Sequence, residues 1–191
     1  VRHLWHVRGL LRVVPARRGG ARTGPPAATG FEPFRDVDRA DSAFANLNPA
    51  DFNWKEIFAG AGWFHWTGIT PAISEAATVA LRAALKEAKA QGLTISADVN
   101  YRKNLWQYGK GPLDVMPELI RYTHVLVAGK SDFENCMDIV LDDWGDACYQ
   151  AKKDYPQIKY ITKTKRESVS ASHNRLKGVL WNGEEILFSN I

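Results

Sequence analysis

The sequence has little that would support a redox, metal-binding or membrane role. Cys136 and Cys148 are the only cysteines, and their spacing fits no metal or redox motif, which favours a reducing, cytoplasmic location. No apolar run approaches the roughly 20 residues that a membrane-spanning helix needs. Lysine is absent from residues 1–39, although arginine is frequent there. We therefore expect no membrane partner.

Positive charge is concentrated at the amino-terminal end of the sequence. The formal net charge is +4, and most of the excess comes from arginines in residues 1–39. Beyond Arg39 the cationic and anionic residues are nearly balanced, which is more typical of a soluble enzyme than of a nucleic-acid-binding protein. The sequence therefore predicts no nucleic-acid partner.

Residues 1–35 differ in composition from the rest of the chain. The segment is rich in Arg, Gly, Pro and Ala and shows no helical or strand period, so it cannot build a core by itself. A transit peptide is one interpretation, but Ser is missing from it and Pro and Gly are frequent. We favour translation of GC-rich DNA in a wrong reading frame. In either case we expect a non-native or disordered leader over residues 1–35 and one domain over residues 36–191.

From Asp51 onward, predicted strands and helices alternate. Apolar runs predict parallel strands over residues 63–69, 93–99, 123–129 and 158–164, and short antiparallel strands over residues 168–172, 177–181 and 185–189. Helices are predicted over residues 53–62, 74–92, 113–122 and 142–155. In the longest helix Ser74 is the expected N-cap, and the expected buried stripe consists of Ala76, Val79, Ala80, Ala84 and Ala88, with Leu81 and Leu85 beside it. This alternation implies right-handed crossovers and a parallel sheet with helices on both faces.

Three polar residues mark the end of the second predicted strand. Asp98, Asn100 and Arg102 occupy alternate positions, so an extended chain would project them from one face of the sheet. The ends of parallel strands are where open α/β sheets bind ligands. The alternative is an ordinary loop in which Asp98 caps a turn and Arg102 is solvated.

Other polar features are less informative. Gly129-Lys130-Ser131 follows an apolar strand, but His124 stands where a phosphate loop would have its first glycine, so we reject a P-loop. His65 and His124 lie in predicted strands and are interpreted as core histidines. No pair of histidines has metal-ligand spacing, so the sequence predicts no protein metal ligands.

The order of four segments resembles the ribokinase (PfkB) family of carbohydrate kinases, and within it the kinases of 2-keto-3-deoxygluconate. The segments are "WFHWTGITPAISE", "ISADVNYRKNLW", "YTHVLVAGKSDFEN" and "YITKTKRESVSAS", and the similarity runs from about Asp38 to Ile191. The resemblance implies an α/β, three-layer ribokinase-like fold with a mostly parallel central sheet, incomplete at both ends. It also implies ATP and Mg²⁺ as cofactors and a small-molecule sugar acid as substrate. Homo-oligomerisation of the intact enzyme is left open.

The resemblance also assigns roles to individual residues. Arg102, in the D-x-N-x-R segment, corresponds to a ligand of the sugar-acid carboxylate, and a guanidinium suits this role because its planar fork binds a carboxylate bidentately. Arg39 corresponds to a second substrate-binding residue, although Val37 stands where the family commonly has Tyr. The residues assigned to the nucleotide or phosphate side are Asp98, Asn100, Asp132, Thr164 and Arg166. Of the family's N-x-x-E segment only the last carboxylate is kept, as Asp132, so we expect weakened or rearranged support for magnesium.

One motif of the family does not occur in these 191 residues. It is the late Gly-Gly-Asp segment, whose backbone N–H groups stabilise the transferring phosphate and whose Asp is the base. We therefore assign no catalytic residue, expect the base to lie beyond the carboxyl terminus, and expect an inactive fragment of a kinase that converts 2-keto-3-deoxygluconate to its 6-phosphate. The alternatives are a non-catalytic protein that binds or senses a sugar acid, and a ribokinase-family kinase for fructose, ribose or adenosine.

Overall fold

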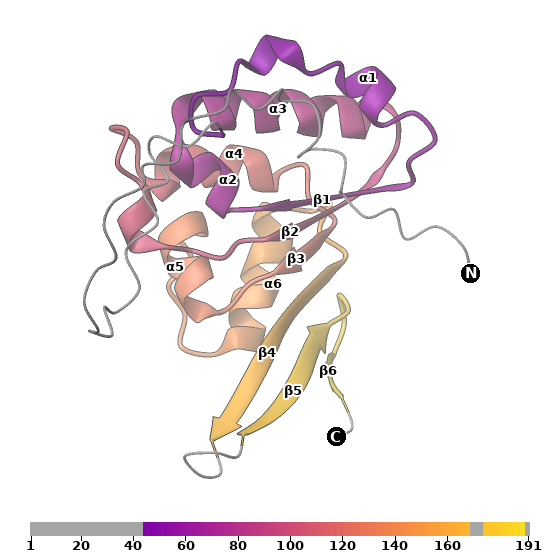
Figure 1. Ribbon diagram of the computed structural model, residues 1–191. Coiled ribbons are helices and arrows are strands. Elements are labelled where there is room, and N and C mark those ends of the chain that lie inside the picture. The colour runs from indigo at the N-terminus through magenta and orange to yellow at the C-terminus, as the bar shows by residue number, and fades with distance from the viewer. Residues whose placement is uncertain (1–43, 169–173, 190–191) are drawn as a thin grey trace, which may run out of the picture. The chain divides into compact units, whose positions relative to one another are not determined.

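The computed structural model describes residues 44–168 and 174–189 (Figure 1). The chain divides into two units, residues 1–36 and 37–191, and every described residue belongs to the second. The leader predicted over residues 1–35 therefore lies outside the described residues. No helix in the described part of the chain is both long and apolar enough to cross a bilayer.

Strands and helices alternate in the order predicted. In chain order the elements are η1 (Pro49–Asp51), α1 (Trp54–Ile57), β1 (Trp63–Thr67), α2 (Ile69–Ile73), α3 (Glu75–Ala90), β2 (Thr94–Asp98), η2 (Lys103–Leu105), α4 (Pro112–Ile120), β3 (Val125–Val127), α5 (Lys130–Met137), α6 (Trp144–Asp154), β4 (Tyr160–Ser168), β5 (Asn174–Trp181) and β6 (Ile186–Phe188). Helices α2 and α5 were not predicted. The strand predicted over residues 168–172 lies largely outside the described residues, and its first residue, Ser168, belongs to β4.

The six described strands form one sheet in the order β1-β2-β3-β4-β5-β6. Strands β1 to β4 are parallel, and β5 and β6 are antiparallel to their neighbours, which confirms the prediction of a mostly parallel sheet. Thr67 pairs with Asp98, Asp98 with Val127, and Val127 with Thr162. The carboxyl ends of β1, β2 and β3 therefore lie in a row at one edge of the sheet, beside Thr162 near the start of β4.

The helices of the described residues lie in one layer. Helices α3, α4, α5 and α6 contact one another in that order, as they follow the strands across the sheet (Figure 1). The reason is topological. The parallel strands are added in one direction only, and right-handed crossovers that all move the same way place their helices on the same face. The second helical layer that the sequence led us to expect is not contributed by these residues.

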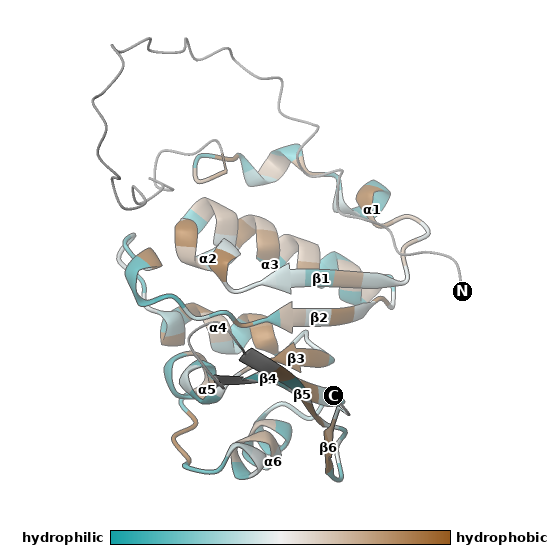
Figure 2. Cartoon of the chain, turned by 60° about the horizontal axis from the view of Figure 1, so that its bottom comes forward, coloured by the Kyte–Doolittle hydropathy of each residue, from teal (hydrophilic) through white to brown (hydrophobic). Residues whose placement is uncertain are grey.

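The sheet has one buried face and one open face. In β1, Phe64 and Trp66 are buried toward the helices, whereas Trp63 is 57% exposed and His65 is also exposed. Figure 2 shows mostly hydrophobic residues on β3. The prediction of a core histidine at position 65 is wrong, because β1 places this side chain on the open face. There its Nδ1 lies 2.8 Å from the hydroxyl of Ser96.

The long helix α3 begins as predicted and buries five of the seven residues that the sequence placed on its buried side, the exceptions being Ala76 and Val79. The Ser74 hydroxyl accepts a hydrogen bond from the Ala77 N–H at 3.1 Å, which confirms the N-cap. Val79, expected in the stripe, is 41% exposed. It lies two residues after the buried Ala77, which is about 200° around the helix axis. The residues of α3 that are buried are Ala77, Thr78, Ala80, Leu81, Ala84, Leu85 and Ala88.

Gly68 lets the ends of β1 and β2 approach closely. Its N–H donates to the carbonyl of Asp98 at 2.8 Å, and a β-carbon at this position would clash with the Val99 carbonyl oxygen and lie 2.9 Å from its carbon. Both of the clashing atoms are backbone atoms and cannot rotate away. Only glycine fits at this position without moving the exit of β2.

We expect Gly68→Ala to lower the free energy of unfolding by about 1–3 kcal/mol, the usual cost of overpacking. Urea unfolding followed by circular dichroism measures it. Gly62→Ala is the matched control, because a β-carbon there would meet nothing within 4 Å. Equal unfolding midpoints for the two variants would contradict the close approach.

Candidate active site at the carboxyl ends of the strands

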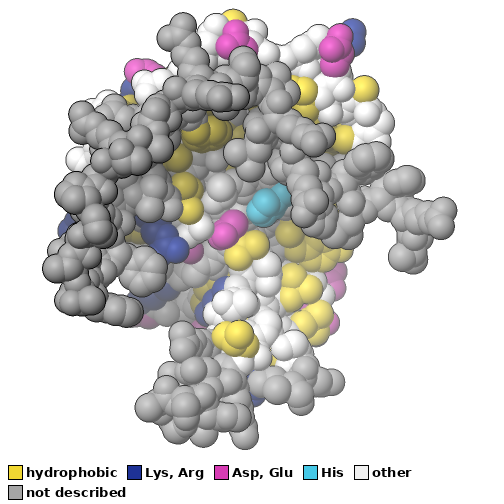
Figure 3. Space-filling view, in the orientation of Figure 1, with side chains coloured by type: hydrophobic (Ala, Val, Ile, Leu, Met, Phe, Trp, Pro, Cys, Tyr) yellow, Lys and Arg dark blue, Asp and Glu magenta, His cyan; other side chains and the backbone are white. Residues whose placement is uncertain are grey.

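A cleft of about 380 Å³ opens where β2 and β3 end, alongside β4. In the space-filling view of Figure 3, acidic, basic and histidine side chains lie close together near the centre of the face that is shown. The cleft is lined by Asp98, Asn100, Tyr101, Val127, Ala128, Gly129, Ser131, Asp132, Lys163 and Thr164. Four of the residues predicted for the nucleotide or phosphate side, Asp98, Asn100, Asp132 and Thr164, are therefore brought together, although their roles stay predictions.

The chain leaves the extended conformation directly after β2. Asn100 has a φ of 43°, in the left-handed region that Asn tolerates better than most residues. Asp98 and Asn100 still line one cleft, but Arg102 is exposed and is not among the lining residues. The expectation that all three project from one face is therefore wrong for Arg102, because the alternation of side chains holds only within a strand. Arg102 is nevertheless close enough for its charge to act on Asp98.

Asp98 carries a charge that its surroundings disfavour. Burial raises the pKa of Asp98, and the neighbouring Asp132 carboxylate raises it further. The charges of His65 and Arg102 and a hydrogen bond from the Asn100 backbone offset part of this effect. A half-buried carboxylate with a raised pKa in a cleft is typical of a functional group rather than of a structural one.

Asp132 ties two segments of the cleft together through its carboxylate. Oδ1 accepts the Tyr101 N–H at 2.9 Å, and Oδ2 accepts the Gly129 N–H at 2.7 Å. The second bond closes the first turn of α5, and the first holds the loop that follows β2 against that turn. Asp132 therefore positions the backbone on both sides of the cleft.

The loop of residues 99–111, which carries Arg102, is anchored at its far end as well. The Tyr108 hydroxyl donates to the carbonyl of Pro71 at 2.7 Å and lies 3.1 Å from the Thr78 hydroxyl. Lys110 forms an ion pair with Glu75 at the start of α3. These contacts fix the loop against α2 and α3, so Arg102 is held on a supported segment.

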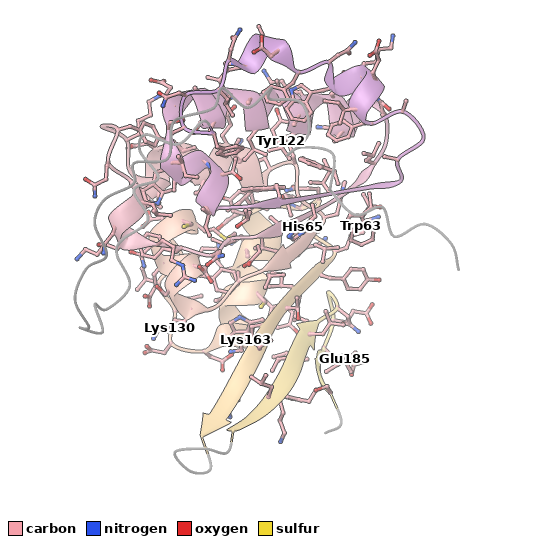
Figure 4. All side chains as sticks on the ribbon, in the orientation of Figure 1. Trp63, His65, Tyr122, Lys130, Lys163 and Glu185 are labelled. Atoms are coloured by element: carbon pink, nitrogen blue, oxygen red, sulfur yellow. The ribbon has the colours of Figure 1, made fainter. Side chains whose placement is uncertain are left out.

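Sequence reasoning missed Lys163 and the helix α5 that borders the cleft. The ammonium of Lys163 lies 4.4 Å from the centre of the Trp144 ring, and burial lowers its pKa. Figure 4 shows where this side chain lies on β4. The available signals were a lysine close to the carboxyl end of the strand predicted over residues 158–164 and an acidic residue three positions after Gly129, which is the spacing of a capping box.

Two predicted residues cannot be placed. Arg39 lies outside the described residues, and Arg166 lies in β4 but its side chain is outside the described part of the chain. In the described ranges no group of three or more His, Cys, Asp or Glu residues is arranged to hold a metal ion. Magnesium in kinases is commonly bound by one or two carboxylates together with substrate phosphates. The oxygens of Asp98 and Asn100 fit that kind of site.

Comparisons with known proteins agree on one group of enzymes. No family model matches the chain. The chain is 33% identical to 2-dehydro-3-deoxygluconokinase from Thermotoga maritima, whose crystal structure matches 80% of this chain with a TM-score of 0.72. A PfkB family carbohydrate kinase from Listeria grayi matches 78% of this chain at 30% identity with a TM-score of 0.69. A curated 2-dehydro-3-deoxygalactonokinase from Haloferax volcanii is 32% identical over 102 residues, which are 53% of this chain.

The chain spans only part of each of these relatives. It covers 47% of the Thermotoga protein, 46% of the Listeria protein and 31% of the Haloferax protein. Within that span the predicted ribokinase-like α/β fold is confirmed. In sequence and structure the chain is similar to PfkB carbohydrate kinases.

The raised pKa of Asp98 leads to a prediction about the free energy of unfolding. Because the pKa of Asp98 is raised in the folded state above its ordinary 3.8, the ionised carboxylate destabilises the fold at neutral pH, and this penalty disappears once the group is protonated. Asp98→Asn should therefore raise the free energy of unfolding at pH 7, and the gain should shrink as the pH falls toward 3.8.

Urea unfolding at several pH values measures this effect. Asp138→Asn is the control, because Asp138 is exposed and its left-handed backbone suits Asn equally well. A loss of stability in Asp98→Asn at pH 7 would show that the carboxylate is structural.

Proposed function

We propose that this chain supplies part of an ATP-dependent kinase of the PfkB family that phosphorylates a sugar acid, with 2-keto-3-deoxygluconate as substrate and its 6-phosphate as product. The observation that carries the proposal is the cleft at the strand ends, where Asp98, Asn100 and Thr164 converge beside the loop of Arg102. The similarity to 2-dehydro-3-deoxygluconokinase at 33% identity supports the choice of substrate.

Arg102 is the proposed ligand of the sugar-acid carboxylate. It is exposed, it lies on a loop anchored at both ends, and its charge acts on the neighbouring Asp98. A guanidinium in this position can bind a carboxylate through two parallel hydrogen bonds, while its fixed loop limits the entropy lost on binding. Arg39 is the proposed second contact to the substrate.

ATP and Mg²⁺ are the proposed cofactors. Solved relatives of lower identity include a fructokinase with bound ATP and a ribokinase-type protein with ATP and Mg²⁺. In this chain the oxygens of Asp98 and Asn100 would hold the ion, and the hydroxyl of Thr164 would donate to a phosphate oxygen. A bound magnesium ion supplies neutralisation of the charge that develops on the phosphate oxygens. Arg166 is proposed to lie on the nucleotide side.

The protein groups of the cleft can bind and orient reactants, but the proton acceptor is not among the assigned residues. A Gly-Gly-Asp segment does not occur in the sequence. A non-catalytic protein that binds a sugar acid is therefore the second candidate function, because the cleft is formed without that segment. A kinase of the same family acting on another sugar is the third.

We predict that the chain as given transfers no phosphate at a kinase-like rate. Loss of the base and of the anion hole should cost several orders of magnitude in rate. A coupled assay of ADP release with 2-keto-3-deoxygluconate and Mg-ATP tests this. Turnover on the order of 1 per second or faster, which is within the usual range of kinases, would show that another residue is the base.

We predict that Arg102→Met weakens binding of 2-keto-3-deoxygluconate by roughly 2–4 kcal/mol, the loss expected for a charge-assisted bidentate contact. Titration calorimetry of the purified chain measures it, and ATP affinity should be nearly unchanged. Lys103→Met is the matched control, because Lys103 is the adjacent exposed cation. Equal losses of affinity for the sugar acid and ATP would show that Arg102 is structural. No loss of affinity for either would support the alternative in which Arg102 is a solvated residue of an ordinary loop.

A further inference from the structure

His124 connects three neighbouring strands at their amino ends, the end of the sheet opposite to the cleft. Its backbone N–H donates to the carbonyl of Ile95 in β2 at 2.8 Å. Its own carbonyl accepts the N–H groups of Lys159 at 2.7 Å and Tyr160 at 3.2 Å, at the start of β4. Because β3 begins at the next residue, Val125, the backbone of His124 ties β2, β3 and β4 together.

The imidazole of His124 adds a bond that the strand backbone does not supply. The Ile95 N–H donates to Nδ1 of the ring at 3.0 Å. Pairing of β2 with β3 starts only one residue later, where Ser96 lies beside Val125. Ile95 is fully buried, and a buried N–H without an acceptor is costly. The ring therefore takes the place of a missing carbonyl at this end of β3.

This hydrogen bond fixes the protonation state of the ring. Since Nδ1 accepts a hydrogen from a backbone N–H, it carries no proton of its own, and the neutral ring has its proton on Nε2. A second proton would go to Nδ1 and would face the Ile95 N–H, donor against donor. Unlike a hydroxyl, a backbone N–H cannot turn around and become an acceptor. The bond can therefore form only while His124 is neutral.

The charged groups around the ring also oppose its protonation. Among the described residues, those whose charges act on His124 are two cations, Lys159 before β4 and Lys89 near the end of α3. Tyr122, two residues before His124, is the titratable side chain that packs against Lys89, with 5.7 Å from the ammonium to the ring centre. Burial, and after it these two positive charges, lowers the pKa of His124.

We propose that His124 is a pH-sensitive clamp of the sheet, which holds the amino end of β2 against β3 while its ring is neutral and releases the Ile95 N–H when the ring takes up a proton. The clamp lies at the opposite end of β2 from Asp98, so the proposal does not depend on what the cleft binds.

The clamp stabilises the fold at neutral pH and loses its contribution on acidification. The ordinary pKa of a histidine, 6.5, applies to the unfolded chain, whereas the pKa of His124 in the folded state is lower. Between the two values the unfolded chain binds the proton more readily, so the free energy of unfolding falls as the pH falls. The contribution of His124 is therefore complete above pH 6.5 and is lost as the pH drops through the lower, folded-state pKa.

Nuclear magnetic resonance of the full chain tests the clamp directly. At about pH 8 the His124 ring should show a bare Nδ1 and a protonated Nε2, and it should titrate below 6.5. The protection of the Ile95 amide against hydrogen exchange, corrected for the intrinsic effect of pH, should fall roughly 2- to 10-fold between about pH 8 and about pH 5, the range for one lost hydrogen bond. The Val99 amide, which donates to the Val127 carbonyl just beyond the other end of β2, is the internal reference and should keep its protection.

His124→Asn is the matched variant, because Oδ1 of Asn lies as many bonds from the backbone as Nδ1 of His and accepts a hydrogen bond without titrating. Its urea midpoint should gain on that of the wild-type chain as the pH is lowered from about 8 to about 5. Comparison of the two chains cancels the effect of Asp98, whose protonation acts with the opposite sign and is common to both.

His65→Asn is the control for the other described histidine of the sheet. Nδ1 of His65 lies 2.8 Å from the Ser96 hydroxyl, which can donate to a neutral ring or accept from a charged one, so this contact survives protonation. His65→Asn should therefore retain the pH-dependent loss of protection at Ile95.

Several results would overturn the clamp. One is a proton on Nδ1 of His124 at about pH 8, and another is a ring that titrates at or above 6.5. Ile95 protection that falls no more than that of Val99, or that no longer depends on pH in His65→Asn, would also overturn it. So would a His124→Asn midpoint that follows the wild type at every pH. If His124→Asn does not fold, the ring titration and the Ile95 exchange of the wild-type chain decide.

Discussion

The geometry of the cleft depends on the two hydrogen bonds that the Asp132 carboxylate accepts. Its two oxygens accept N–H groups from Tyr101 and Gly129, so a single side chain joins the loop after β2 to the first turn of α5. The left-handed backbone of Asn100 is kept in place by this bond on one side and by the end of β2 on the other. Backbone N–H groups are costly to bury without a hydrogen-bond partner. By accepting the N–H groups of Tyr101 and Gly129, Asp132 fixes two backbone segments that line the cleft.

The close approach at Gly68 complements this bond on the other side of β2. With no β-carbon in the way, the backbone at the end of β1 packs against Val99, and the register places Thr67 beside Asp98. Asp98 is thus held at a defined point of the strand edge. A carboxylate can be kept partly buried there only because the surrounding backbone is fixed by packing.

Two groups of opposite charge, Asp98 and Lys163, lie partly buried in the cleft. Burial disfavours the charged form of each, and neither finds an ionic partner within hydrogen-bonding distance among the described residues. A site optimised only for stability would pair them or replace them with apolar groups. If the cleft binds a cation and a phosphate, as the proposed kinase function requires, the cation would supply a counter-charge to Asp98 and the phosphate one to Lys163.

The sequence by itself determined the order of the strands and of helices α1, α3, α4 and α6, the cap at Ser74 and the strand end at Asp98, because these depend on local periodicity and on short-range hydrogen bonds. Through the resemblance of its segments it also indicated four of the ten residues that line the cleft. Only the tertiary structure decided that His65 lies on an open sheet face, that Arg102 does not line the cleft and that Lys163 lines it beside Trp144. These depend on which face of a strand is covered and on a left-handed residue in a loop, and neither can be read from local sequence.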